Sequence, residues 1–232
     1  MKVLLLTGTI RPLVNIKYKD PEIRLQEYTR TIQKYLENTD FDVIVFAENS
    51  GYAFLKTARK LDQLAKSKNK SFEYLDLSQC ADNRNMSTGE AVLMRSALKE
   101  SKLLQKADYI WKSTGRVFIR NANKIIQGKQ KKDNVFLYSR ACDSIQTWFF
   151  GINKCDLEKL LSDEVIDEMS RGCIEYAWMS YYRQHGDTMK ITSFQCYPDA
   201  EGVNSSGVSY TLSPIKLALK NVLLKFGWFT VR

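Results

Sequence analysis

The sequence predicts an α/β protein with a mostly parallel central sheet flanked by helices. Short apolar runs alternate with amphipathic stretches through the first half of the chain, beginning with "KVLLLTG" at residues 2–8. Such runs are typical of strands buried on both faces of a parallel sheet. The alternation breaks down in the second half, where the sheet is expected to become mixed.

The elements follow from these patterns in order. The stretch 21–39 has apolar residues at 25, 28, 32, 35 and 36, the spacing of one helical face. The first half predicts strands at 2–8, 41–49, 71–77 and 108–113, with helices at 21–39, 53–68 and 87–107. The second half predicts strands at 134–140, 146–153 and 190–197, helices at 156–169 and 172–184, and a loop at 198–207. A last helix is expected to begin at Ser213 and Pro214, an N-cap residue followed by a proline at the first helical position.

The length, net charge and cysteine content of the chain limit the classes of function to consider. The chain has 232 residues, which fits one domain, and its net charge of +9 favours an anionic partner such as nucleic acid, an acidic membrane or a phosphorylated small molecule. Its five cysteines form no CxxC pair and it has one histidine, which argues against a disulfide framework, a zinc site or a histidine triad. We find no run of about 18 apolar residues and expect a cytoplasmic protein.

Polar side chains follow three of the predicted strands. Carboxyl ends of parallel strands meet at one edge of a sheet, where ligands of such folds bind. Hydroxyls, amides and glycines suit a base and a ribose, and cations suit phosphates. The residues predicted to bind a nucleotide there are Thr7, Gly8, Thr9, Glu48, Asn49, Ser50, Lys112, Thr114, Gly115 and Arg116.

The two best-known nucleotide signatures, GxGxxG after the first strand and GxxxxGK[ST], are both absent from the sequence. The segments "LLLTGTIRP", "IVFAENSGY", "GEAVLMRSAL", "YIWKSTGRV", "TWFFGINK" and "CIEYAWMSYY" occur in this order. Together they resemble bacterial glycosyltransferases of capsule and lipopolysaccharide (O-antigen) gene clusters, with their K-x-T-G-R and E-N-S-G motifs. The resemblance implies a GT-A-like fold and a nucleoside-diphosphate sugar donor, with UDP the commonest nucleotide. It also implies a saccharide or lipid-linked saccharide acceptor.

The sequence departs from GT-A enzymes at the metal site. These enzymes place Asp-x-Asp after the fourth strand, where this chain has Lys112, Ser113, Thr114, Gly115 and Arg116. Its one D-x-D, Asp40 to Asp42, precedes a strand and is expected to be a polar turn. We therefore expect Lys112 and Arg116 to hold the diphosphate in place of a metal, with no cofactor, although a divalent metal stays open. The plainer alternative is a pair of surface cations in salt bridges.

An inverting transferase needs a carboxylate base for the acceptor hydroxyl. Glu175, near a predicted helix start, and Asp143, before an aromatic strand, are the catalytic candidates. For Glu175 the alternative is a first-turn glutamate that interacts with the helix dipole. Glu90 also matches the family pattern, but "STGE" at 87–90 predicts a capping box that explains it without function.

The late loop "AEGVNSSG" is expected to close over the diphosphate through Gly202, Ser205, Ser206 and Gly207, unless it is a plain loop. Of the aromatic residues that flank the strands, such as Trp148, most are expected in the core and some are able to stack on a base or sugar. We expect one domain, with a nucleotide-binding half at 1–116, an acceptor half at 117–212 and a basic amphipathic helix at 213–232. That helix either packs on the domain or contacts the inner face of the plasma membrane.

Two other functions fit parts of the sequence. A nucleic-acid-binding domain fits the charge, but the basic residues are scattered and no RRM, KH, helix-turn-helix or zinc-finger signature occurs. Another nucleotide-dependent transferase, such as a nucleotidyltransferase, fits the strand ends, but the paired acidic metal ligands of that class are not found in the sequence.

Overall fold

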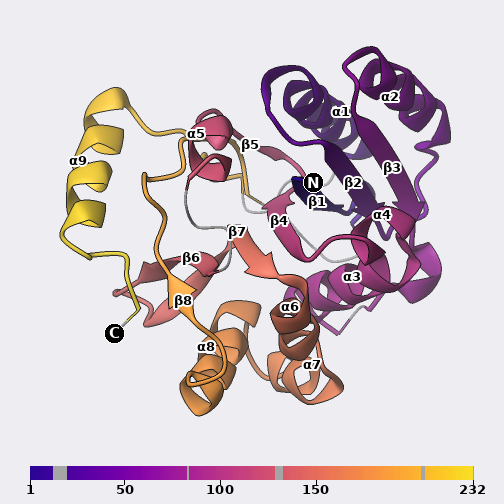
Figure 1. Cartoon of the computed structure of the whole chain (residues 1–232). Helices are drawn as coiled ribbons and strands as arrows, with labels where there is room; N and C mark the ends of the chain where they lie inside the picture. Colours follow the sequence, from indigo (N-terminus) through magenta and orange to yellow (C-terminus); the bar gives the residue numbers. More distant parts are fainter. Residues whose placement is uncertain (13–19, 83, 129–132, 205–206, 232) are drawn as a thin grey trace.

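The computed structural model describes residues 1–12, 20–82, 84–128, 133–204 and 207–231. Its centre is a seven-stranded sheet that runs between the two sets of helices (Figure 1). In spatial order the strands are β3 (Ser71–Asp76), β2 (Val43–Glu48), β1 (Val3–Gly8), β4 (Tyr109–Thr114), β7 (Ser144–Asn153), β6 (Asn134–Ser139) and β8 (Ile191–Thr192). A second sheet pairs β5 (Val117–Ile119) with β9 (Ala200–Gly202).

The main sheet is mostly parallel, as predicted. β3, β2, β1 and β4 pair in parallel, and β6 pairs in parallel with β8. β7 is antiparallel to both of its neighbours, β4 and β6, and is the one described strand of this sheet that runs against the others. The predicted α/β class, with a mixed second half, is thereby confirmed.

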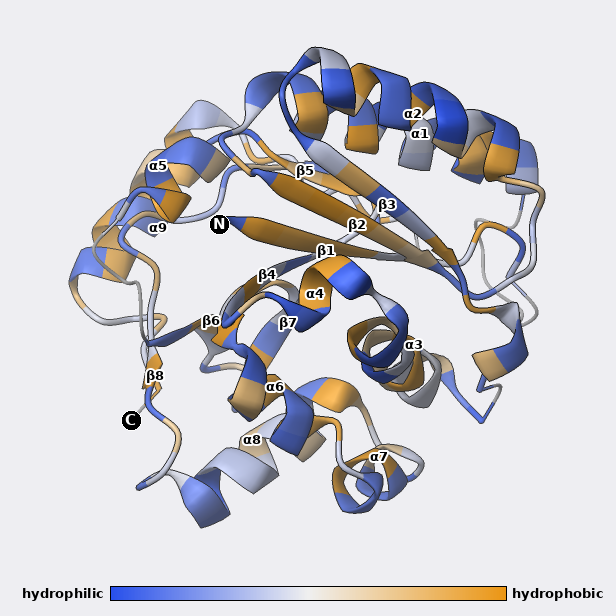
Figure 2. Ribbon diagram, turned by 45° about the vertical axis from the view of Figure 1, so that its right-hand side comes forward, coloured by the Kyte–Doolittle hydropathy of each residue, from blue (hydrophilic) through white to orange (hydrophobic). Residues whose placement is uncertain are grey.

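Helices cover both faces of the sheet (Figure 2). α1 and α2 lie on one face, and α3, α6, α7 and α8 lie on the other. The described helices are α1 (Pro21–Asn38), α2 (Leu55–Ser67), α3 (Met86–Glu100), α4 (Lys102–Gln105), α5 (Ala122–Ile126), α6 (Lys154–Leu160), α7 (Asp163–Met169), α8 (Ile174–His185) and α9 (Pro214–Lys225), with a 3-10 turn η1 (Ser78–Cys80).

The alternation of side chains along β1 connects the two cores. Val3 and Leu5 pack in the core beneath α3, whereas Leu4 and Leu6 pack in the core beneath α1. All four are fully buried, because successive side chains of a strand point to opposite faces and both faces are covered. This is the environment that the unbroken apolar run predicts.

Local signals set the helix ends. The Asp20 carboxylate accepts hydrogen bonds from the backbone N–H groups of Glu22 and Ile23, and Pro21 takes the first position of α1. The predicted start of the last helix is confirmed, since Ser213 accepts from the Lys216 N–H and Pro214 follows it.

Two predicted helices are each divided in two. The stretch 87–107 breaks at Ser101, which is extended and accepts a hydrogen bond from the Leu104 N–H to start α4. The stretch 156–169 breaks between Leu160 and Asp163, giving α6 and α7. Serine competes with the helical backbone through its own hydroxyl, which explains the break at Ser101.

The late part of the chain departs most from prediction. Only Ile191 and Thr192 of the predicted strand 190–197 pair with the sheet. The predicted loop 198–207 contains β9, which pairs with β5 about 80 residues earlier. Strands of three residues carry too little periodicity to be found from sequence.

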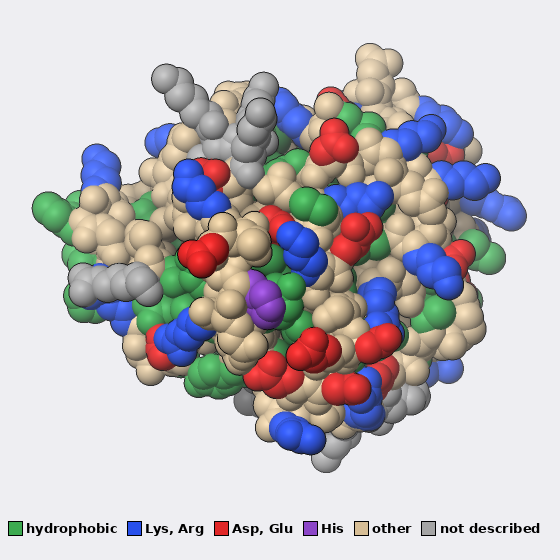
Figure 3. All heavy atoms as spheres, turned by 60° about the horizontal axis from the view of Figure 1, so that its bottom comes forward, with side chains coloured by type: hydrophobic (Ala, Val, Ile, Leu, Met, Phe, Trp, Pro, Cys, Tyr) green, Lys and Arg blue, Asp and Glu red, His purple; other side chains and the backbone are tan. Residues whose placement is uncertain are grey.

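The surface charge is uneven. Acidic side chains gather over α7, whose sequence is DEVIDEM (Figure 3). Hydrophobic side chains are exposed along the edge that α9 forms, with Lys and Arg beside them (Figure 3).

Two glycines allow the strand ends to pack around Tyr28 of α1. A Cβ atom on Gly8 would lie 2.7 Å from the rings of Tyr28 and Phe46. A Cβ atom on Gly115 would lie 2.7 Å from the Thr7 carbonyl oxygen and 2.9 Å from the Tyr28 ring. Gly115 therefore lets the end of β4 approach β1, and Gly8 makes room for the two aromatic rings.

We expect Gly115→Ala to lower the free energy of unfolding by about 1–3 kcal/mol, because the added methyl meets backbone and an aromatic ring that are both fixed. Denaturant titration measures this change. Gly172→Ala is the matched control, since a Cβ there meets no described atom within 4 Å. Equal stability of the two variants would show that the strand ends have room to move apart.

Candidate active site

A pocket of about 580 Å³ opens at the carboxyl ends of the parallel strands. The ends of β1, β2 and β4 form one side of it, and the start of α3, the first half of β7 and the start of α8 form the other. This is the edge at which ligands of open α/β sheets bind. The lining includes Thr7, Gly8, Thr9, Asn49, Ser50, Thr114, Arg116 and Glu175, all of which the sequence analysis singled out.

The ends of β1 and β2 are tied to each other. The Thr9 hydroxyl donates to the Asn49 side-chain oxygen at 2.6 Å, and the Ser50 hydroxyl accepts from the Arg11 N–H at 2.9 Å. Glu48 is fully buried beside them, and its Oε1 accepts from the N–H groups of Ile10 and Ser50. These bonds fix the rim of the pocket before any ligand arrives.

Three predicted donor-binding residues, Glu48, Lys112 and Gly115, are buried and are not part of the described lining. Glu48 and Gly115 connect and space the strand ends. These two residues therefore hold the edge of the sheet together. Thr9, Asn49 and Ser50, in contrast, line the pocket with polar groups.

Lys112 lies elsewhere than expected. We predicted an ammonium group facing a diphosphate, but its side chain is fully buried in the sheet. The ammonium is ion-paired with Glu90 and donates to the Thr147 carbonyl oxygen at 3.0 Å. A lysine on a strand buried on both faces points into a core, and there it requires a partner.

Glu90 has a partner that the sequence did not predict. The capping box of α3 is formed by Asn85 and Thr88, and the Asn85 side chain accepts from the N–H groups of Ser87 and Thr88. The expected box from Ser87 to Glu90 is therefore wrong by two residues. Glu90 instead lines the pocket, accepts from the Thr7 hydroxyl at 3.2 Å and pairs with Lys112.

Two guanidinium groups make the other side of the pocket positive. Arg116 and Arg24 both line it, and each residue is only 4% exposed. Arg116 donates to Glu27 at 2.9 Å and to the Asn204 carbonyl oxygen at 3.2 Å, while its Nε is buried without a hydrogen-bond partner among the described residues. Arg24 donates to the Thr9 carbonyl oxygen and to the Tyr28 hydroxyl.

The two arginines affect each other. Burial lowers the pKa of the Arg24 guanidinium from its ordinary value, and the positive charge of Arg116 lowers it further, although Tyr28 and Glu27 oppose this. Two buried like charges in one pocket favour an anion between them. The sequence analysis missed Arg24, because a basic residue near the start of a helix usually faces solvent.

Glu175 lies in the first turn of α8 and lines the pocket. Its Oε1 accepts from the Thr147 hydroxyl at 2.7 Å. The Thr147 carbonyl oxygen thus accepts a hydrogen bond from the Lys112 ammonium, and the Thr147 hydroxyl donates one to Glu175. One chain of polar contacts therefore connects Glu90 of α3 with Glu175 of α8.

Tyr210 was also missed by the sequence analysis. Burial raises its pKa to about 12, the carboxylates of Glu90 and Glu175 add to the rise, and Arg116 opposes it. All three charged residues line the same pocket as Tyr210. Its ring lies against Trp148, with 5.1 Å between ring centroids, so the two aromatic residues form one wall of the pocket.

Asp143, the second catalytic candidate, lies away from this pocket. It occupies the turn between β6 and β7 with φ of +48°, a conformation that Asp adopts more readily than most residues. Arg183 bonds to both of its carboxylate oxygens at 2.6 Å, and Tyr138 donates to it as well. These contacts lower the pKa of Asp143, with Arg183 the larger cause, and they give it a role in the turn.

The late loop is only partly as expected. Ser205 and Ser206 lie outside the described residues. Gly202 belongs to β9, where a Cβ atom would collide with the Arg116 carbonyl oxygen, and Gly207 forms a turn by donating to the Asn204 carbonyl oxygen at 3.1 Å. The described part of the loop reaches the pocket through Asn204, which the sequence analysis did not name.

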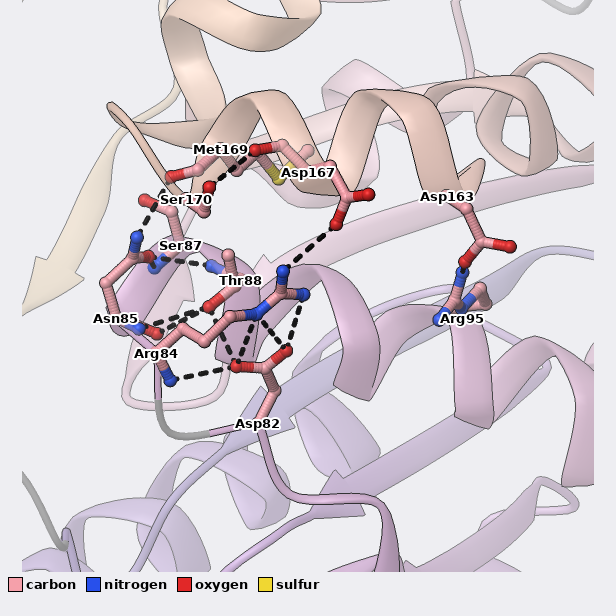
Figure 4. A network of polar contacts seen from close by, with 10 residues as sticks. All are labelled: Asp82, Arg84, Asn85, Ser87, Thr88, Arg95, Asp163, Asp167, Met169 and Ser170. Atoms are coloured by element: carbon pink, nitrogen blue, oxygen red, sulfur yellow. Dashed lines mark hydrogen bonds and ion pairs between the residues drawn. The ribbon is translucent and has the colours of Figure 1, made fainter.

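A polar network holds the acidic side of the pocket in place (Figure 4). Arg84 pairs with Asp82 at 2.8 Å and with Asp167 of α7 at 3.0 Å, and Asn85 donates to the Met169 carbonyl oxygen at 2.9 Å. The hydrogen bond from Arg84 is the main cause that lowers the pKa of Asp82. The network joins the start of α3 to α7, and so fixes Glu90 relative to α8.

The D-x-D sequence is structural. Asp42 accepts from the Lys2 N–H at 2.6 Å, and Asp40 accepts from the Gln127 amide. Both precede β2, at the opposite end of the strand from the pocket. In the part of the chain that the structure describes, no group of three His, Cys, Asp or Glu side chains is arranged to hold a metal ion.

Comparisons with known proteins give similarity of structure alone. No family model matches the sequence, and no match among the curated proteins was found. A 4-diphosphocytidyl-2C-methyl-D-erythritol synthase from Anaerococcus prevotii is 9% identical, with coverage of 97% of this chain and 96% of that one at a TM-score of 0.47. A nucleoside-diphosphate-sugar pyrophosphorylase from Vibrio cholerae is 14% identical, with coverage of 82% and 90% at a TM-score of 0.47.

The bifunctional glycosyltransferase WbbM is 9% identical over 77% of this chain and 36% of its own, with a TM-score of 0.47. At these values the likeness is confined to the general course of the chain, and it assigns no substrate or reaction. None of the helices described in the structure is both long and apolar enough to cross a membrane.

The ion pair between Lys112 and Glu90 predicts that one substitution, Lys112→Met, changes stability in opposite directions in the parent protein and in a Glu90→Gln variant. Glu90→Gln should lower the free energy of unfolding by about 3–5 kcal/mol, because it leaves a fully buried ammonium without its anion. Lys112→Met should destabilise the parent protein but stabilise the Glu90→Gln variant, since it removes that uncompensated charge. Denaturant titration of the four proteins measures both effects. The same cost for Lys112→Met in both backgrounds would show that the two groups are not coupled.

Proposed function

We propose that this protein is a glycosyltransferase that moves a sugar from a nucleoside-diphosphate donor, with UDP the first choice, to a saccharide or lipid-linked saccharide acceptor. The observation that carries this proposal is the charge separation inside one pocket. Arg24 and Arg116 lie on one side, and Glu90 and Glu175 lie on the other, at the carboxyl ends of parallel strands. A diphosphate and a proton-accepting carboxylate are the two requirements of glycosyl transfer by inversion.

Residues 1–116 would hold the nucleotide. Thr7, Thr9, Asn49, Ser50 and Thr114 offer hydroxyls and an amide along the pocket, which suit a base and a ribose. Gly8 lines the pocket at the same edge, and its lack of a side chain makes room for the Tyr28 ring.

Arg116 would bind the diphosphate. Two of its guanidinium nitrogens are held by Glu27 and by the Asn204 carbonyl, and its buried Nε has no hydrogen-bond partner among the described residues. Arg24 adds positive potential while its own bonds hold the Thr9 backbone in place. Lys112 acts differently from the expectation, by holding Glu90 rather than a phosphate.

Glu175 is the proposed catalytic base. Its carboxylate takes the proton of the acceptor hydroxyl, and the oxygen forms a bond to the anomeric carbon of the donor sugar. The bond from that carbon to the diphosphate breaks, and both of its electrons leave with the nucleoside diphosphate. Arg116 then faces the charge that grows on the leaving oxygen, where a fixed cation lowers the barrier.

Glu175 suits this role better than the other two carboxylates. In the part of the chain that the structure describes, Glu175 has no salt bridge and accepts a hydrogen bond from a neutral hydroxyl. Glu90 is already ion-paired with Lys112, and Asp143 lies outside the described lining of the pocket. Glu90 would instead orient the acceptor or the donor sugar.

The acceptor half, residues 117–212, would supply the aromatic wall. Trp148 and Tyr210 together offer an apolar surface and a phenol group whose pKa burial raises to about 12, so it is protonated at neutral pH. A sugar ring has apolar faces and hydroxyl edges, which match such a wall. The resemblance of the sequence motifs supports an acceptor that belongs to a bacterial surface polysaccharide, such as capsule or O-antigen.

A thermal-shift screen of nucleotides and nucleotide sugars tests the donor class directly. Stabilisation by one nucleoside diphosphate, retained in EDTA, followed by release of that diphosphate with a saccharide acceptor, is the expected result. Release of pyrophosphate from a nucleoside triphosphate would identify a nucleotidyltransferase instead. Activity lost in EDTA and restored by manganese or magnesium would overturn the proposal that arginine takes the place of a metal.

Arg116→Ala should lower the catalytic efficiency, kcat/KM, because it removes a charge-assisted contact to the leaving group. The expected loss of transition-state stabilisation is about 2–4 kcal/mol. Arg120→Ala is the matched control. Arg120 is four residues away and ion-paired with Asp199, outside the described lining of the pocket. Similar small effects of both changes would make Arg116 a structural residue.

Glu175→Gln should leave the fold and the donor affinity unchanged and lower kcat about 100-fold or more, since an amide cannot take the proton. Asp143→Asn is the matched control and should keep its activity. Isothermal titration of the donor and steady-state kinetics separate the two effects. The reverse order of activities would assign the base to Asp143.

A further inference from the structure

Helix α9 exposes its apolar side chains to solvent. Ile215 and Phe226 are each 82% exposed, and Leu219 and Val222 are each about half exposed. Single exposed apolar residues are ordinary on a protein surface, but four on one helix make a continuous stripe. We call these four residues the apolar stripe.

The stripe follows from helical spacing. At 3.6 residues per turn, positions 215, 219, 222 and 226 fall on one side of the helix. Lys216 and Lys225 are exposed and lie about a quarter turn to either side of it. The stripe is therefore bordered by a positive charge along both edges.

The opposite side of α9 packs on the body of the protein. Leu224 is buried in the core beneath α1, and the Asn221 side-chain oxygen accepts from the Tyr197 N–H at 2.9 Å. The Lys220 ammonium lies 4.6 Å from the centre of the Tyr197 ring and 5.2 Å from that of Phe229. These contacts fix the rotation of the helix, so the stripe faces outward as a consequence of packing.

The residues after the helix are also held. Arg140 donates to the carbonyl oxygens of Gly227 and Trp228, and its guanidinium lies 4.4 Å from the centre of the Trp228 ring. Tyr138 of β6 donates its N–H to the Phe229 carbonyl oxygen at 3.0 Å. Trp228 remains 46% exposed and extends the apolar surface beyond the stripe.

Charge indicates what covers the stripe. From Gly202 to Arg232 the sequence has no Asp or Glu, whereas Lys216, Lys220, Lys225 and Arg232 all occur there. A second copy of the chain seated stripe to stripe would bring lysines together without acidic partners. The acidic side chains gather instead over α7, on another part of the surface (Figure 3).

We propose that α9 binds an anionic lipid surface and lies in the plane of the membrane interface. The apolar stripe and Trp228 enter the boundary between headgroups and acyl chains, and Lys216 and Lys225 contact anionic headgroups. An exposed stripe, flanking lysines and an aromatic residue at its end are the features of helices that bind in this way.

The same helix begins close to the pocket. Tyr210 lines the pocket and Ser213, the N-cap of α9, follows three residues later, so the two lie at most about 11 Å apart. A membrane-bound α9 would hold the pocket near lipid headgroups, where a lipid-linked acceptor presents its sugar. This second step rests on the proposed function, but the binding of α9 to lipid does not.

Co-sedimentation of the full chain with vesicles tests the binding. We expect the protein to sediment with phosphatidylcholine vesicles that contain phosphatidylglycerol, and much less with phosphatidylcholine alone. The double variant Ile215→Ser and Phe226→Ser should bind at least about tenfold more weakly, since two apolar side chains leave the interface. Leu55→Ser, which changes a 64% exposed apolar residue on α2, is the matched control and should bind as the parent does.

The lysines give a second measurement. Lys216→Gln together with Lys225→Gln should weaken binding to the anionic vesicles and reduce its dependence on salt. Circular dichroism and thermal unfolding confirm that each variant is folded, as expected for side chains exposed to solvent.

Two outcomes overturn the proposal. One is equal binding of the parent and the Ile215/Phe226 variant to anionic vesicles. The other is a parent protein that forms a dimer in sedimentation velocity and becomes a monomer in that variant, because a second copy would then cover the stripe. Neither measurement involves a nucleotide, so failure here is distinct from failure of the donor screen.

Discussion

A fully buried ammonium group in the middle of the central sheet organises the site. Lys112 lies on β4, between the cores of both faces, and a charge in that position requires an anion and a further acceptor. Glu90 of α3 supplies the first and the Thr147 carbonyl of β7 supplies the second. Because Thr147 also donates to Glu175, the contacts that satisfy one lysine join four elements, β4, α3, β7 and α8, and hold two carboxylates relative to one another. Removing either partner would leave a charge in a medium that solvates it poorly.

The positive side of the pocket is prepared in the same manner. Arg24 and Arg116 are held by the Thr9 and Asn204 carbonyls and by Glu27, so their guanidinium groups are already oriented and largely dehydrated. Preorganised charges in a site with little water interact strongly with charge that develops in a reaction. Burial is the main cause that lowers the pKa of Arg24, and the positive charge of Arg116 lowers it further, so both effects oppose folding. An anion bound between the two guanidinium groups would offset both effects and stabilise the folded protein.

The sequence predicted the helices and strands around this site better than the side-chain contacts within it. The apolar run of β1 and the cap of α9 depend on neighbouring residues, and both were predicted correctly. Lys112, Arg24 and Tyr210 depend on packing between segments far apart in the chain, so local patterns could not place them. The motif around Lys112 drew attention to the correct strand end, but it could not distinguish a cation that faces a ligand from one that holds a carboxylate. β5 and β9 are three residues each, and they pair across a separation of about 80 residues.

The direction of β7 explains how the carboxylate side comes to face the arginines. Ser113 near the end of β4 pairs with Phe149, so the residues that precede Phe149 lie beyond the carboxyl end of β4. Had β7 run parallel, Thr147 and Trp148 would lie toward the opposite end of the sheet, away from Glu90 and from Tyr210. The reversal of one strand thus brings a hydroxyl, a carbonyl and an aromatic ring to the edge where the parallel strands present their polar ends. In the proposed function, the parallel half of the sheet would bind the anionic donor, and the reversed strand with α8 would supply the base and the wall for an acceptor.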